Sequence, residues 1–115
     1  MSAEAQKARD AATRVIAVCD VIAQIVADGE ASFLGDVQAR WAAEMGLIRI
    51  GEDVAKIPAT VRERFPTQPW RQIIDMRNFA AHQYDDLDPH RVWRTLTVDV
   101  PRLRSYLADA VIPGL

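Results

Sequence analysis

The side chains best suited to chemistry lie within eight consecutive residues, 77–84. Arg77 could hold a phosphate and neutralise the charge that grows on it in a transition state. His82 titrates near neutral pH and could act as a general base or acid, while Asn78 could orient either partner by hydrogen bonding. RNA is the substrate that suits such a pair without a metal ion, because its 2′-hydroxyl supplies the nucleophile.

The spacing of these residues limits how they can meet. Asn78 and His82 are four residues apart and share a helix face. Arg77 and His82 are about 140° apart on an ideal helix, too far to touch unless the long Arg77 side chain bends round. Otherwise either the helix unwinds before His82, or the two groups meet across an interface with another copy of the chain.

Structural roles also fit these residues on spacing alone. An arginine and a histidine near a helix end are usually surface residues that interact with the helix dipole, and Tyr84 would by default be a half-buried core residue. The sequence has no glycine-rich phosphate loop and no Gly-x-Ser-x-Gly elbow, and its two histidines, His82 and His90, lack metal-ligand spacing. We therefore predict no metal site and no cofactor.

Helical periodicity runs through the chain and predicts one all-α domain over residues 1–115. We expect helices over about 2–28, 32–56 and 67–84, a short helix over 58–64, and a last helix that Asp88 caps and Pro89 begins. Pro101 should kink that last helix. The predicted fold is an up-and-down four-helix bundle with an additional short helix.

The apolar spacing also predicts the buried side of each helix. Two apolar stripes on the first helix, one of which includes Cys19, favour burial in the core and against a second subunit. We expect Gly46 or Gly51 to permit a close helix contact, and all three tryptophans to be core residues. The inner side of the second helix is predicted to carry Leu34, Val37, Trp41, Met45 and Ile48.

The composition is that of a globular protein, with 50% hydrophobic residues, 26% charged residues and a net charge of −2. That net charge gives no global attraction to nucleic acid. We find no secretory signal and no apolar run near the ~20 residues that span a bilayer. The sequence therefore predicts a soluble cytoplasmic protein with no membrane partner.

The segment 69–78, continued by His82, Gln83 and Tyr84, closely resembles the HepT-like branch of the HEPN superfamily. The pattern of that branch is Arg, four residues, His, one residue, Tyr, and this sequence matches it in full. Flanking segments such as Ile50-Gly51-Glu52 extend the resemblance over nearly the whole chain. One departure is Asp53, where the family commonly has alanine.

The resemblance implies a homodimer in which Arg77 and His82 of both subunits line a shared cleft. It implies a metal-independent endoribonuclease that cleaves RNA, such as tRNA or mRNA, as the toxin of a toxin–antitoxin pair. The antitoxin would be a minimal nucleotidyltransferase that attaches AMP to Tyr84. An adenylate there would add bulk and negative charge within a turn of His82 and compete for Arg77.

Two other functions stay open at the level of sequence. One is a non-catalytic nucleotide-binding or adaptor subunit of a minimal nucleotidyltransferase, in which Arg77 and His82 would grip a nucleotide or the partner. The acidic net charge slightly favours it, since many RNA-handling proteins carry a strong positive field. The other is a purely structural helical bundle.

Overall fold

A computed structural model describes residues 1–82 and 88–115, with the side chains of Phe79, Ala81 and His82 outside the description. All the described elements are helical, which confirms the predicted all-α class. They are α1 (Ala3–Ala27), α2 (Glu30–Gly35), α3 (Val37–Ala55), α4 (Ala59–Arg62), α5 (Trp70–His82), α6 (Pro89–Arg94), a π-helical turn η2 (Thr95–Asp99), α7 (Val100–Tyr106) and a second π-helical turn η3 (Leu107–Val111).

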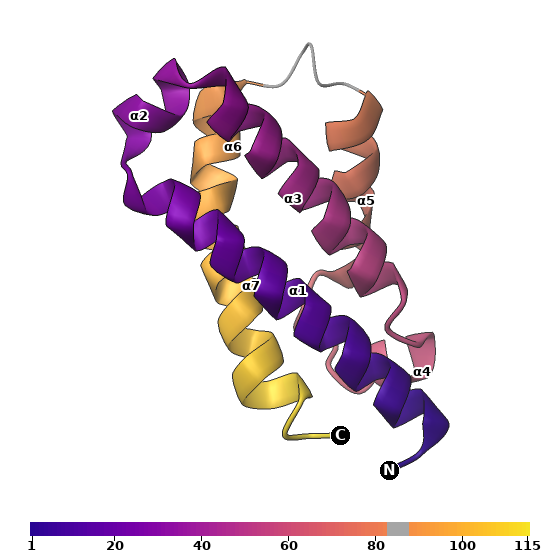
Figure 1. Ribbon diagram of the computed structural model, residues 1–115. Helices are drawn as coiled ribbons and strands as arrows, with labels where there is room; N and C mark the ends of the chain where they lie inside the picture. The colour runs from indigo at the N-terminus through magenta and orange to yellow at the C-terminus, as the bar shows by residue number, and fades with distance from the viewer. Residues whose placement is uncertain (83–87) are drawn as a thin grey trace.

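Helix α3 lies in the middle of the molecule, between α1 and α5 (Figure 1). The C-terminal segment from α6 to η3 packs behind α1. The four long segments alternate in direction along the chain, and both termini lie at the same end (Figure 1). We call the exposed surface of α1 and α3 that faces the viewer in Figure 1 the outer face.

Local capping explains where the N-terminal helices begin and end. The Ser2 hydroxyl accepts a hydrogen bond from the Ala5 amide at 3.0 Å, and Gly29, with φ of +90°, separates α1 from α2. The structure corrects the prediction of one helix over 32–56, because the chain leaves the helical conformation at Asp36. The Asp36 carboxylate caps α3 by accepting from the amides of Gln38 and Ala39.

The last helix begins as predicted, with the Asp88 carboxylate accepting from the His90 amide at 3.0 Å and Pro89 in the first turn. We expected Pro101 to disturb the regular helix. The structure has a π-helical turn there, η2, which is followed directly by α7. Pro101 thereby falls in the first turn of α7, where a missing amide proton costs little.

The predicted inner side of the second helix is wrong for its largest residues. Val37, Trp41 and Met45 are 44%, 66% and 51% exposed. A second apolar stripe of α3 forms the core instead, namely Ala43, Leu47, Ile50 and Val54. Both stripes recur at helical spacing, and the buried one contains neither Trp41 nor Met45. Of the other two tryptophans, Trp70 is buried and Trp93 packs partly buried against the core.

The first helix carries the wide buried face that was predicted, including Val15 and Cys19. Burial raises the pKa of the Cys19 thiol to about 12, as expected of a core residue. No helix in the described ranges is long and apolar enough to cross a membrane.

Candidate active site

Helix α5 carries the candidate residues and is anchored at its first turn. The indole Nε1 of Trp70 donates to the carbonyl oxygens of Phe65 at 2.9 Å and Arg62 at 3.1 Å. The Tyr106 ring packs edge-on against Trp70, with ring centroids 6.4 Å apart. The start of α5 is therefore fixed against both α4 and the C-terminal segment.

Arg77 lies in the seam between α5 and α3, over Gly51. A Cβ atom added at Gly51 would come within 2.6 Å of the Arg77 Cβ and 3.1 Å of the Arg77 backbone nitrogen. Helices α3 and α5 are thus closer together here than they could be if residue 51 had a side chain. The prediction of a close helix contact at a glycine is confirmed at Gly51.

The Arg77 guanidinium leaves this seam beside Glu52, with its Nη1 atom 3.7 Å from Glu52 Oε1. The Arg77 side chain is 32% exposed, so a ligand can reach it. The sequence pointed to Glu52 only as part of the family resemblance and did not predict this contact. Such an exposed pair stabilises the fold by about 0–1 kcal/mol and serves mainly to orient Arg77.

Helix α5 continues through His82, so the helix does not unwind before the histidine. Arg77 and His82 are therefore about 140° apart around the axis and about 7.5 Å apart along it. Glu52 follows Gly51 on α3, so its contact holds the Arg77 guanidinium on the side of α5 that faces α3.

Asn78 is exposed, on the side of α5 that it shares with Arg71, Asp75 and position 82. This side is about 100° from Arg77 around the helix. Tyr84, the predicted modification site, lies outside the described residues. The structure thus places Arg77 and Asn78 on one accessible helix and leaves the arrangement of the histidine and tyrosine side chains undescribed.

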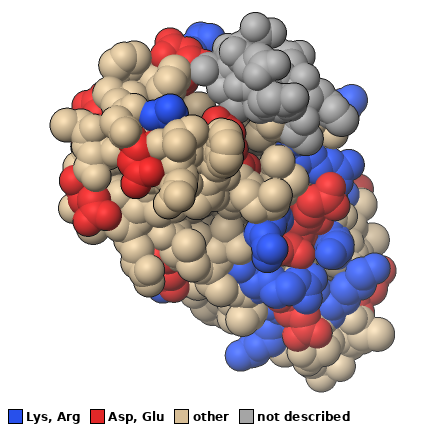
Figure 2. All heavy atoms as spheres, turned by 45° about the horizontal axis from the view of Figure 1, so that its top comes forward, with Lys and Arg blue, Asp and Glu red and all other residues tan. Residues whose placement is uncertain are grey.

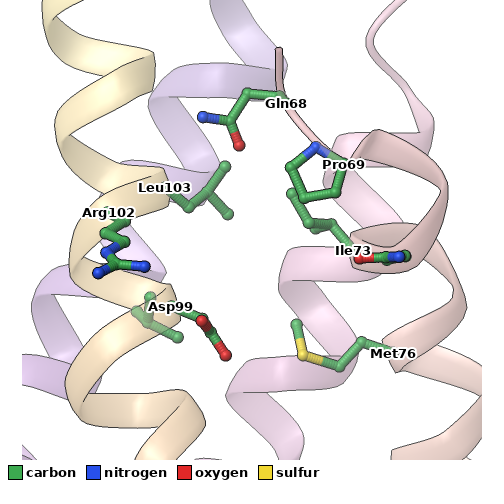
Figure 3. Close-up of a pocket in the computed structure, with 9 residues that line it drawn as sticks. Gln68, Pro69, Ile73, Met76, Asp99, Arg102 and Leu103 are labelled. Atoms are coloured by element: carbon green, nitrogen blue, oxygen red, sulfur yellow. The ribbon is translucent and has the colours of Figure 1, made fainter. Parts of the chain in front are cut away.

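A groove of about 350 Å³ lies on a different side of α5, between it and α7 (Figure 3). Ile73 and Met76 line it from α5, and Leu103 from α7. Met76 is about 160° from Asn78 around the axis, so the groove opens away from the Asn78 side. Of the candidate site residues whose side chains the structure describes, Arg77 and Asn78, neither lines this groove.

Exposed apolar side chains gather on the outer face beside the last turns of α5. Val37, Trp41 and Met45 follow one another at intervals of four along α3, and Val21 lies on the adjoining part of α1. We call these four residues the apolar patch. Among the described residues, Met1 is the one exposed large apolar side chain outside this patch. Patches of this kind mark interaction surfaces.

Comparison with known proteins gives a consistent match over most of the chain. Residues 15–110 match the family described as Ribonuclease HepT-like. Two putative RNases of Methanocaldococcus jannaschii are 32% and 33% identical over 73 residues, which is 64% of this chain and 67% and 60% of theirs. A probable ribonuclease HepT of Thermococcus cleftensis is 33% identical over 73 residues, or 64% of this chain and 66% of its own length. The aligned stretch thus spans about two thirds or less of these relatives, and no solved structure matches significantly.

Proposed function

The chain belongs to the HepT-like ribonuclease family, and we propose that it is a metal-independent endoribonuclease whose site contains Arg77 and His82. The observation that carries this proposal is the placement of Arg77. Gly51 and Glu52 hold its guanidinium at an accessible edge, on the helix that also carries His82. A guanidinium in that position suits a phosphodiester, which it can bind through two parallel hydrogen bonds.

The proposed reaction uses the 2′-hydroxyl of RNA as its nucleophile. His82 removes the 2′ proton, and the 2′-oxygen forms a bond to the adjacent phosphorus. The bond from phosphorus to the 5′-oxygen then breaks, and that oxygen takes a proton from a water molecule. Arg77 stabilises the negative charge that accumulates on the phosphoryl oxygens, and Asn78 orients the phosphate or the imidazole.

We propose that two copies form the site together. In one chain, positions 77 and 82 are about 140° apart around α5, and the contact with Glu52 holds the Arg77 guanidinium on the side that faces α3. The apolar patch, with Trp41 66% exposed, lies beside the same end of α5 and would be covered by a second copy. A twofold dimer about this region would bring two α5 helices together, so that the arginine of one chain could meet the histidine of the other.

We further propose that Tyr84 is the point of control in a toxin–antitoxin pair in the cytoplasm. A minimal nucleotidyltransferase acting as antitoxin would attach AMP to the Tyr84 hydroxyl. Tyr84 follows His82 by two residues, so the added phosphate and base would occupy the site next to the histidine. The phosphate would also compete with RNA for Arg77.

RNA cleavage by purified, unmodified protein in the presence of a chelator tests the proposal. We expect the protein to cut RNA, to leave the same sequence made of 2′-deoxynucleotides intact, and to lose activity in Arg77→Ala and His82→Ala. Arg102→Ala removes an exposed arginine from the α7 side and serves as the matched control that keeps activity. Equal cleavage by wild type and His82→Ala, or cleavage of the deoxy strand, would refute it.

A further inference from the structure

Figure 2 shows a group of cationic side chains, interleaved with acidic ones, on the side of the molecule below the grey residues. Arg49 and Lys56 are exposed residues of α3, seven positions apart and so on nearly the same side of that helix. Arg14 joins them from α1, where its Nε atom is 3.0 Å from Asp53. We call Arg14, Arg49 and Lys56 the basic strip. Arg77 packs over Gly51, so it lies beside the strip at a level between Arg49 and Lys56.

The acidic residues within the strip do not cancel its charge. Asp53 is shared by two cations, at 3.0 Å from Arg14 and 3.5 Å from Lys56. This carboxylate therefore orders both side chains and leaves one positive charge in excess. Arg49 makes no salt bridge or hydrogen bond with another described residue. Glu52, which is 55% exposed, lies between Arg49 and Lys56 on the same side of α3. The three cations and two carboxylates therefore leave one positive charge in excess, on a chain whose net charge is −2.

The side chains of the strip remain available to a ligand. Arg14 is 49% exposed and Lys56 is 56% exposed. The Arg14 contact with Asp53 uses Nε, and no other hydrogen bond of this guanidinium is recorded within the described residues. Its terminal nitrogens can therefore donate to a phosphate while the existing contact is kept.

We infer that the basic strip binds the phosphate backbone of single-stranded RNA and guides it to Arg77. Arg49 and Lys56 are about 10 Å apart along α3, far enough for each to contact a different phosphate of the strand. Arg77 lies beside the strip, and the proposed function places it on the phosphate that is cleaved. This inference rests on that proposed function and extends it to the path of the substrate.

The other half of the outer face carries the apolar patch, which offers no counter-charge to a polyanion. The strand is therefore expected to leave the site along the charged half, over the C-terminal end of α3. An acidic surface of a partner protein is the competing occupant. The experiment distinguishes it, because loss of the strip would then leave RNA binding unchanged.

Binding of a labelled single-stranded RNA to the full chain carrying His82→Ala, which keeps the RNA intact, tests this inference by fluorescence anisotropy. The variants are Arg49→Ala with Lys56→Ala, and Arg102→Ala as a control that removes one exposed positive charge from α7. We expect the double variant to weaken binding several-fold for every RNA sequence. The slope of log K against log salt should fall in magnitude by about 1.4, at ~0.7 for each contact with a single strand.

Equal affinities and salt slopes for the double variant and the Arg102→Ala control would overturn the inference, as would the absence of RNA binding by the His82→Ala protein. Both altered residues are exposed on a helix, and circular dichroism verifies that the fold is kept. The ribonuclease proposal fails separately, if wild-type protein leaves RNA uncut. The two results are therefore distinguishable.

Discussion

Gly51→Ala is the substitution for which the structure makes the sharpest prediction. In the interior of a helix, alanine is favoured over glycine by about 1 kcal/mol. At this position the added methyl group would be 2.6 Å from the Arg77 Cβ, 3.1 Å from the Arg77 nitrogen and 3.2 Å from the Ile74 carbonyl oxygen. None of these atoms can move by a side-chain rotation, so the two helices must separate.

Overpacking of this kind costs about 1–3 kcal/mol, which outweighs the gain in helix propensity. We expect Gly51→Ala to lower the free energy of unfolding by up to about 2 kcal/mol, or the melting temperature by about 4 °C for each kcal/mol. It should also reduce kcat/KM for RNA, by up to about 100-fold, because the phosphate-binding Arg77 moves with α5.

Gly46→Ala is the matched control on the same helix. Its added methyl group would meet the end of the Ile22 side chain at 3.0 Å, which can turn aside. Urea unfolding at one protein concentration and initial rates of RNA cleavage give the comparison. We expect Gly46→Ala to stay within about 1 kcal/mol of wild type and to remain active. A Gly51→Ala protein as stable and as active as Gly46→Ala would refute the role of this glycine.

Three further predictions concern the rest of the chain. Trp41→Glu should dissociate the proposed dimer in light scattering while the helical circular dichroism spectrum is kept, and a variant that stays dimeric would exclude the apolar patch from the interface. Asp36→Ala should lower the free energy of unfolding by about 0.5–2 kcal/mol in urea, because α3 loses its N-cap; an unchanged midpoint would contradict that role. Cys19, with its thiol pKa raised from 9.0 to about 12, should resist alkylation at pH 8 until the protein is unfolded, and rapid labelling of the folded protein would show that it is accessible.

Sequence reasoning located the helices because their caps are local. Ser2, Gly29 and Asp88 act within a few residues of their own positions, and the structure has helix boundaries at all three. Asp36 is also a good capping residue, but the apolar period that runs through it concealed the break between α2 and α3.

The buried face of α3 could not be predicted from periodicity. Two apolar stripes follow the helix, and the one with the larger side chains, including Trp41 and Met45, is the exposed one. Periodicity indicates that one face of a helix is apolar. It does not indicate whether that face is buried by the core of the same chain or by a partner protein. The proposed dimer would explain why the pattern was misleading there.

The candidate site was identifiable because its residues are close together in the sequence, from Arg77 to Tyr84. The residues that position Arg77 belong to another helix. The sequence indicated Gly51 as one of two glycines that could permit a close helix contact, and it indicated Glu52 only through the resemblance. The contact between Arg14 and Asp53 joins residues 39 positions apart, and no local pattern encodes such a pair. Long-range contacts of this kind need the folded structure.

The most direct test of the central claim mixes two inactive chains. Arg77→Ala and His82→Ala proteins are each measured for RNA cleavage alone, and again after they are unfolded together in equal amounts and refolded. If two copies form the site, mixed dimers hold one intact pair of Arg77 and His82, and activity should return to about a quarter of wild type. A mixture as inactive as its components, from variants that fold and dimerise, would contradict a site shared between two copies.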